Sequence, residues 1–132
     1  MCLYVDPERH ARKGDKNRRA YRRARTVTSP ILVYKVLKNE NSHEYATSPY
    51  RKFRWLFGKE HTAKFSHFFN NHYDEHTIDE GLHAFRNIQK ANELKSYQHV
   101  YRVYYAVIPV GAEVYMGTYD EIVSTKMTVY AS

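Results

Sequence analysis

The sequence has little cysteine and no long apolar run. Cys2 is its one cysteine, so no disulfide can form within the chain, as suits a reducing compartment. No segment approaches the ~18 consecutive apolar residues that span a bilayer. The apolar start at residues 1–5 gives way at once to Asp6, Pro7 and Glu8, unlike the apolar core of a secretion signal. We therefore expect an intracellular protein without membrane insertion.

Low hydrophobicity, the mark of a disordered chain, is also absent. The 132 residues are 42% hydrophobic and 15% aromatic, which is ample for a buried core, and the length suits one domain. Thirteen tyrosines and six phenylalanines predict an aromatic core whose Tyr hydroxyl groups find polar partners at its edge.

Acidic side chains are scarce at the N-terminus. Residues 1–25 hold nine basic and three acidic side chains, a net charge of +6, whereas the other 107 hold twelve basic and eleven acidic ones. Few apolar residues interrupt the basic run, so it cannot form an amphipathic face. We expect residues 1–29 to be a basic N-terminal arm, extended when alone, and residues 30–132 to be the folded domain. Against an acidic partner, residues 15–25 are able to become a helix capped by Asp15.

The remaining pattern predicts strands more than helices. β-Branched and aromatic runs predict strands at residues 31–37, 53–57, 100–109, 114–116 and 122–130. Phenylalanines at helical spacing predict a short helix over residues 62–70. Residues 77–96 admit a long helix opened by Thr77 and Glu80, or a strand at 82–85 followed by a helix capped by Asn87. We favour the second reading because Gly81 disfavours a helix.

The predicted fold class is therefore α+β: a small single domain with a mostly antiparallel sheet of about five strands and one or two short helices, preceded by the basic arm. Residues 38–49 are expected to be a polar loop.

Several short stretches resemble a family of small uncharacterised proteins from bacteriophages, bacteria and large DNA viruses. They are residues 33–37, 48–50 with 58–59, 80–85, 108–112 and 122–127, and the most specific is Glu-Gly-Leu-His-Ala-Phe at 80–85, which is usually Gly-Phe-His in the relatives. The resemblance covers roughly residues 31–130 and implies a fold and a viral or bacterial context, with the host cytoplasm or the virion as the location. The family has no established activity, and the basic arm departs from its pattern.

The arm is the strongest functional signal. Its cations are able to neutralise phosphates or carboxylates, and arginine, seven to two over lysine, binds both groups in bidentate fashion. The alternative is a solvated tail that aids solubility. We expect an acidic macromolecule, nucleic acid or a protein assembly, to bind these side chains: Arg9, Arg12, Lys13, Lys16, Arg18, Arg19, Arg22, Arg23 and Arg25.

Catalytic and metal-binding signals are weaker. The segment around His83, with Glu121 on a later strand, is similar to the core of ADP-ribosyltransferases, in which Glu121 would be the catalytic glutamate; the first-strand His or Arg motif is missing. Histidines 61, 67, 72, 76 and 83 lie among acidic residues, but no spacing fixes a metal geometry, and surface histidines explain them better. We expect no metal and no cofactor. Cys2 is expected to be an inert thiol, and a strand alternating core and surface explains the basic aromatic stretch 51–55 better than base stacking does.

The leading hypothesis is a non-enzymatic viral or phage accessory or structural protein. Its α+β domain would dock on protein, and its arm would contact an acidic partner. One alternative is a nucleic-acid-binding protein. Another is an ADP-ribosyltransferase-like enzyme or nucleotide-binding module that uses His83 and Glu121.

Overall fold

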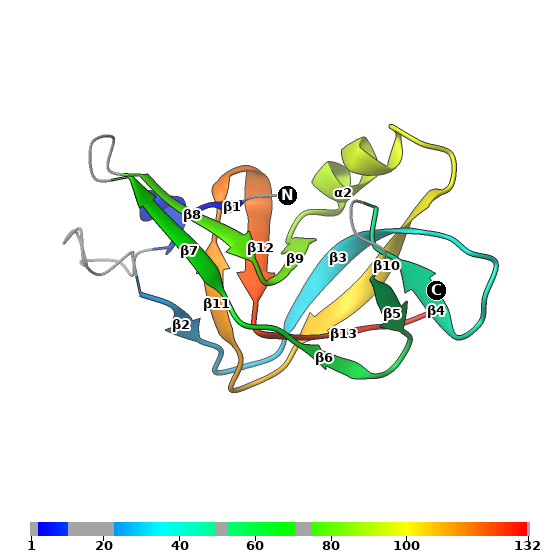
Figure 1. Ribbon diagram of the computed structural model, residues 1–132, viewed down its shortest axis with the longest axis horizontal. Coiled ribbons are helices and arrows are strands. Elements are labelled where there is room, and N and C mark those ends of the chain that lie inside the picture. The colour runs from blue at the N-terminus through cyan, green and yellow to red at the C-terminus, as the bar shows by residue number, and fades with distance from the viewer. Residues whose placement is uncertain (1–2, 11–22, 50–52, 71–74, 132) are drawn as a thin grey trace.

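A computed structural model describes residues 3–10, 23–49, 53–70 and 75–131, and strands dominate it (Figure 1). Strands hold 52% of this part and helices 14%. The elements, in chain order, are β1 Leu3–Tyr4, α1 Pro7–His10, β2 Arg25–Thr26, β3 Ile31–Lys38, β4 Tyr45–Thr47, β5 Arg54–Leu56, β6 Glu60–Thr62, β7 Ser66–Asn70, β8 Glu75–Glu80, β9 Leu82–Phe85, α2 Ile88–Lys95, β10 Tyr101–Ile108, β11 Glu113–Met116, the 3-10 helix η1 Thr118–Asp120, β12 Glu121–Ser124 and β13 Lys126–Val129.

Two antiparallel sheets contain these strands. The larger has ten, in the order β2-β11-β12-β9-β3-β10-β13-β6, with β4 beside β3 and β5 beside β4. The smaller has the order β1-β8-β7. Figure 1 shows β7 and β8 at one end of the molecule, near α1 and β2, and β4 and β5 at the other end.

The predicted α+β class is therefore wrong, because the described part is mostly β and only α2 exceeds six residues among its helices. The expected sheet of about five strands is also too small. Most of the additional strands have two to four residues, too few to show the alternation by which a sequence reveals a strand. These short strands are stabilised by pairing with distant parts of the chain, as Arg25–Thr26 pairs with Glu113–Val114. The local sequence pattern does not predict such pairing.

The pair β3 and β10 forms the centre of the large sheet. Their eight residues pair throughout, from Tyr101 with Lys38 to Ile108 with Ile31, so the strands predicted at 31–37 and 100–109 are confirmed. On one face Val33 and Leu37 join the largest buried cluster, and on the other Val36 packs towards α2. This alternation decides where every side chain of β3 lies.

The helix α2 covers the outer face of β3 and β10. Asn87 caps it by accepting a hydrogen bond from the backbone N–H of Gln89 at 2.8 Å, and Ala91 and Leu94 pack into the cluster around Phe85. The favoured reading of residues 77–96, a strand followed by a helix capped by Asn87, is confirmed. No helix in the described ranges combines the length and the hydropathy needed to cross a membrane.

Three local predictions are wrong. Residues 66–70 form β7 instead of a helix, because register with β8 places Phe68 opposite Thr77 and Phe69 opposite His76. Residues 122–130 form two strands, since β12 pairs with β9 and β13 with β10. The loop expected at 38–49 contains β4, which pairs with β5. Each error comes from pairing with strands elsewhere in the chain, which outweighs local periodicity.

The small sheet packs on the large one through a second cluster. Leu3, Val5 and Ile78 lie against Tyr115 and Val123. Gly81 joins β8 to β9 with φ +144°, and a Cβ there would lie 2.4 Å from Cγ2 of Val123. Only glycine permits both this backbone conformation and this approach of the two sheets.

Candidate functional site

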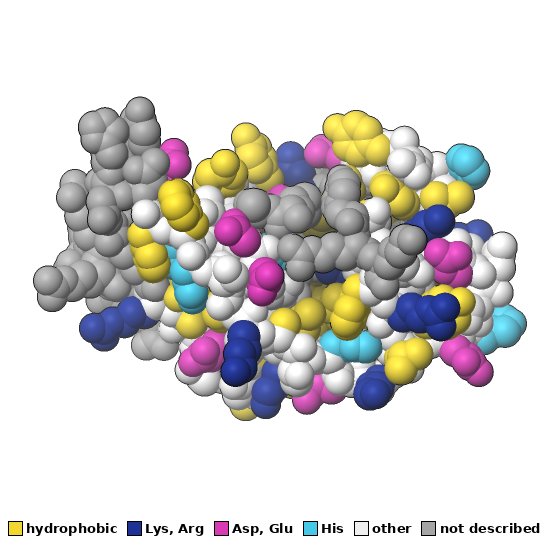
Figure 2. All heavy atoms as spheres, in the orientation of Figure 1, with side chains coloured by type: hydrophobic (Ala, Val, Ile, Leu, Met, Phe, Trp, Pro, Cys, Tyr) yellow, Lys and Arg dark blue, Asp and Glu magenta, His cyan; other side chains and the backbone are white. Residues whose placement is uncertain are grey.

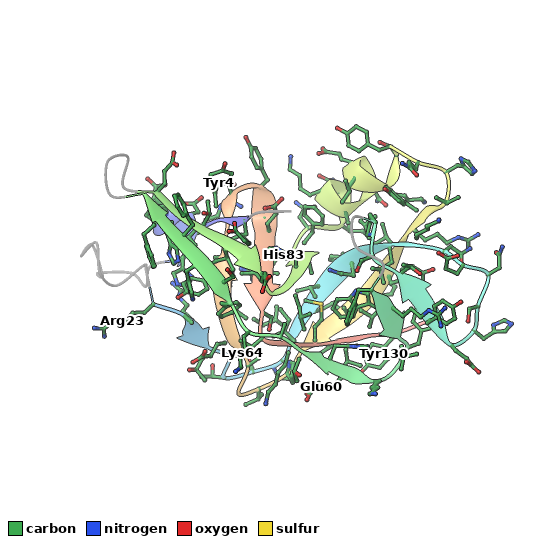
Figure 3. The ribbon with its side chains drawn as sticks, in the orientation of Figure 1. Tyr4, Arg23, Glu60, Lys64, His83 and Tyr130 are labelled. Atoms are coloured by element: carbon green, nitrogen blue, oxygen red, sulfur yellow. The ribbon has the colours of Figure 1, made fainter. Side chains whose placement is uncertain are left out.

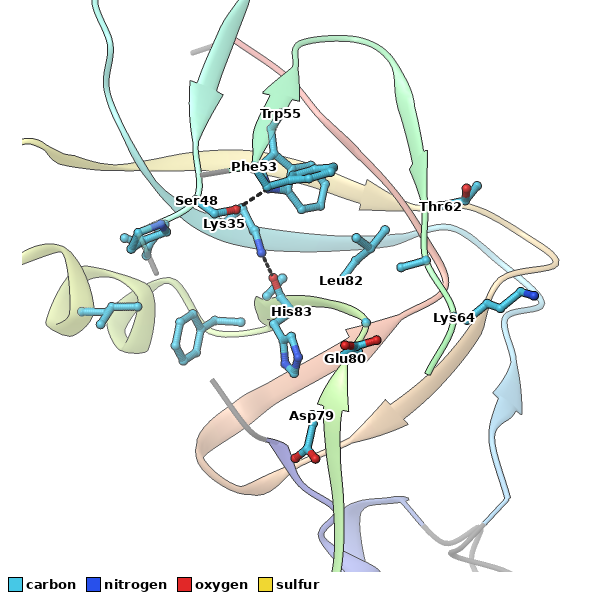
Figure 4. A pocket seen from close by; sticks show the side chains of 17 residues that line it. Lys35, Ser48, Phe53, Trp55, Thr62, Lys64, Asp79, Glu80, Leu82 and His83 are labelled. Atoms are coloured by element: carbon cyan, nitrogen blue, oxygen red, sulfur yellow. Dashed lines mark hydrogen bonds between the residues drawn. The ribbon is translucent and has the colours of Figure 1, made fainter. Parts of the chain in front are cut away.

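A pocket of about 350 Å³ opens where β3 and β9 diverge (Figure 4). These two strands share a single register pair, Tyr34 with Phe85, whereas β3 shares eight with β10. The pocket lies in this gap between the strands. Its walls come from β3, β5, β9 and the segment 62–64, and they are mostly apolar.

Lys35 is the only lysine on the core-facing side of β3. It lies between Val33 and Leu37 in the alternation of the strand, both of which are fully buried. Its Nζ donates a hydrogen bond to the backbone carbonyl of His83, so this side chain bridges the two diverging strands. Lys35 as a whole keeps intermediate exposure, but protein surrounds its amine, and this burial lowers the pKa to about 7.

Trp55 forms the aromatic wall beside this amine. It is 2% exposed, and Lys35 Nζ lies 4.7 Å from its ring centroid, within the range of a cation–π contact. The indole Nε1 donates to Ser48 Oγ at 2.9 Å, and the ring of His61 packs 4.9 Å away. Trp55 is therefore held in orientation from two sides.

Four further titratable side chains belong to the pocket. Lys64, Asp79, Glu80 and His83 line it, and Lys64 and the imidazole of His83 point away from Lys35 in Figure 4. In the part of the chain that the structure describes, Lys35 has no carboxylate partner within ion-pair distance. A buried amine without a counter-ion is costly, and such sites often have a function.

The two residues of the enzymatic alternative share one face of neighbouring strands. His83 pairs with Val123 and Glu121 with Phe85, so the two residues are diagonal neighbours across the strand pair. Burial raises the pKa of Glu121. However, His83 lines the pocket and Glu121 does not.

The basic arm is attached to the domain by His10. This side chain is 1% exposed and stacks on Tyr115 with ring centroids 5.0 Å apart. The backbone N–H of Met116 donates to His10 Nδ1 at 3.1 Å, so Nε2 carries the proton and donates to the Arg23 carbonyl at 2.6 Å. Burial lowers the pKa of His10, the charge of Arg25 adds to this, and the bond to Arg23 opposes it.

The structure describes three of the nine expected contact residues. Arg9 faces its own domain, 2.6 Å from Asp120 and 3.6 Å from Asp6. Arg23 is exposed and extends away from the domain in Figure 3, and Arg25 lies in β2. The others lie outside the described residues: Arg12, Lys13, Lys16, Arg18, Arg19 and Arg22.

The expectation of surface histidines is wrong for His76. His76 is buried and its Nε2 lies 3.1 Å from His67 Nδ1, while His61 packs on Trp55 at the other end of the molecule. Within the described ranges, no three His, Cys, Asp or Glu side chains gather as metal ligands do. Arg54 is exposed over the Tyr45 ring and Trp55 is buried, as alternation predicted. Cys2, His72, Arg51 and Lys52 lie outside the described residues.

Sequence reasoning missed the two side chains that organise these sites. Alternation along residues 31–37 places Lys35 on the same face as Val33 and Leu37, so a buried lysine was open to prediction once the strand was assigned. For His10 the sequence offers no comparable signal, because its partners, Arg23 and Met116, are known only from the fold.

Comparison with known protein families, with curated proteins and with solved structures found no match to this chain.

Proposed function

We propose that this protein is a viral or phage accessory or structural protein that docks on a protein assembly through its β-rich domain and holds an acidic partner with its basic residues at 12–22. The hydrogen bond between His10 and Arg23 supports this most directly. It fixes both ends of a twelve-residue segment at one place on the domain. Six basic side chains and one acidic side chain lie in that segment, so both residues that flank this charge are held on the domain.

The surroundings of His10 offer a second contact surface. Tyr115 connects His10 to the small sheet, since its ring lies 5.0 Å from those of both His10 and His76. On the outer face of that sheet Tyr4 and Phe68 pair with the same residue, Thr77, and are 53% and 57% exposed. Figure 2 shows hydrophobic side chains over β7 and β8. Apolar surface beside a basic segment suits one partner with apolar and acidic groups.

The test is to change the six basic residues of the segment to Gln and to keep His10 and Arg23. The substituted residues are Arg12, Lys13, Lys16, Arg18, Arg19 and Arg22. A matched control changes six exposed basic residues of the domain, with the same loss of net charge: Lys38, Arg54, Lys59, Lys64, Lys95 and Arg102.

Binding to a fluorescent polyglutamate peptide and to a duplex DNA is then measured by anisotropy. We expect the segment variant to lose binding at least tenfold and the control to keep it. Equal losses in the two variants would show that net charge alone matters, and no loss in either would refute the proposal.

Direct nucleic-acid binding is the second candidate, because four of the six segment cations are arginine, whose guanidinium matches phosphate. If all six contact phosphates, the plot of log K against log salt for duplex DNA should have a slope of about −5. A flat response to salt together with retained peptide binding would favour a protein partner.

A further inference from the structure

The Lys35 amine is buried on the core-facing side of β3, and the proposed docking function does not use it. It is held in place by two contacts, the His83 carbonyl and the Trp55 ring, and neither neutralises a charge. An ammonium in this position costs free energy that a neutral amine avoids. The fold thus maintains, beside a pocket, an amine whose lone pair is available near neutral pH.

We propose that the pocket between β3 and β9 binds a small aromatic or apolar aldehyde or ketone and holds it as an imine of Lys35. The amine lone pair attacks the carbonyl carbon, a C–N bond forms, and the C=O electron pair moves to oxygen, which takes the proton from nitrogen. The hydroxyl group then leaves as water with the second proton of the nitrogen, and the C=N bond forms. One water leaves for each imine, and no oxidant or reductant is needed.

The position of Lys35 meets the requirements of this chemistry. An attacking lysine must be neutral and desolvated, and burial holds the pKa of Lys35 at about 7, so about half of the amine is neutral at pH 7. Once protonated, the imine nitrogen keeps one N–H, which can donate to the His83 carbonyl in place of the amine. The contact between β3 and β9 therefore survives the reaction.

The walls select for an apolar body with a carbonyl group. Trp55, Phe53, Leu82 and Phe85 supply aromatic and aliphatic surface, and about 350 Å³ lies within the usual size of small-molecule sites.

A simple anion site is the competing interpretation. Asp79 and Glu80 line the same pocket, and their negative charges disfavour an anion there. The titratable groups around the pocket are thus Lys35, Lys64, Asp79, Glu80 and His83, with Tyr104 paired to Lys35 on β10.

The experiment is reductive trapping of the full-length protein. Benzaldehyde and cyanoborohydride are added at pH 7.5, and benzylated lysines are located by peptide mapping. At this pH the neutral fraction of an amine with pKa 7 exceeds that of an ordinary lysine several-hundredfold. Because access to the pocket slows the reaction of Lys35, the expected advantage is smaller than this ratio. We expect Lys35 to react at least tenfold faster than the exposed Lys59 and Lys95. Equal or slower reaction of Lys35 would overturn the proposal.

Two controls separate the pocket from mere reactivity. Lys35→Met should abolish the fast phase, and Lys64→Met, at the same pocket, should keep it. Benzyl alcohol, which has the same body without a carbonyl, should slow labelling of Lys35 and of no exposed lysine. Absence of this protection, or protection by benzoate alone, would refute the carbonyl site, the latter in favour of an anion site.

Discussion

Replacing Lys35 with Met should stabilise the protein at neutral pH. Burial lowers the pKa of this amine from 10.5 to about 7, and each unit corresponds to about 1.4 kcal/mol. At pH 7 Lys35 is fully protonated in the unfolded chain but only about half protonated in the folded protein. The lysine therefore lowers the free energy of unfolding by about 4 kcal/mol. Methionine has a similar unbranched length and no charge, and it removes this cost.

Part of the gain is lost because the His83 carbonyl loses its donor. An unsatisfied buried acceptor costs about 1–3 kcal/mol. The net effect expected at pH 7 is therefore a rise of about 2 kcal/mol in the free energy of unfolding. Exposed Lys38, three residues along the same strand, provides the control, and Lys38→Met should change stability little.

The dependence on pH gives the decisive comparison. Between pH 7 and 10.5 the folded state binds fewer protons at Lys35 than the unfolded state does, so the stability of the wild type rises with pH in this window. By pH 9.5 the cost of the lysine falls to about 1.5 kcal/mol. The measurement is urea unfolding followed by circular dichroism at pH 7, 8 and 9.5. Between pH 7 and 9.5 the free energy of unfolding of the wild type should rise by about 3 kcal/mol relative to that of the variant. A difference between the two proteins that stays constant over this range would refute the reasoning.

Three further predictions concern other parts of the fold. Gly81→Ala should lower the free energy of unfolding by about 3 kcal/mol, because the added Cβ clashes with Val123. The control Gly58→Ala, at φ +76° with open space around it, should lower it by about 1 kcal/mol. Similar losses of the two variants in thermal unfolding would contradict the packing argument. The pKa of His10 is lowered by burial, so its stabilising contribution is present above pH 6.5 and declines as the pH falls, and the wild type should lose its advantage over His10→Gln between pH 6.5 and 5 in urea unfolding. Phe68→Ser should leave stability within about 0.5 kcal/mol, because the side chain is mostly exposed; a large drop in Tm would show that it belongs to the core.

The long elements could be predicted from sequence, and the short ones could not. The β-branched runs of β3 and β10 and the cap at Asn87 are local signals, and the structure contains all three elements. By contrast, β1 and β2 have two residues each, and only their partners β8 and β11 hold them extended. The aromatic spacing at Phe65, Phe68 and Phe69 matched a helix by chance, because these rings lie in and beside an edge strand.

The sites divide in the same way. The charge of the basic segment is visible in the sequence because it depends on composition alone. The closure of that segment by His10, and the approach of Lys35 to the His83 carbonyl, depend on contacts across 13 and 48 residues of chain. No local pattern specifies such contacts, although alternation along residues 31–37 would have indicated that Lys35 shares a face with Val33 and Leu37.

The attachment at His10 changes what a protease should release. A cut anywhere between residues 11 and 22 separates the chain into two pieces, yet Leu3, Val5 and His10 remain buried in the body of the protein. The short N-terminal fragment should stay associated by non-covalent contacts, visible as two bands on a denaturing gel and as one species under native conditions. Cleavage would then leave both pieces of the basic segment attached to the domain, one through His10 and one through Arg23.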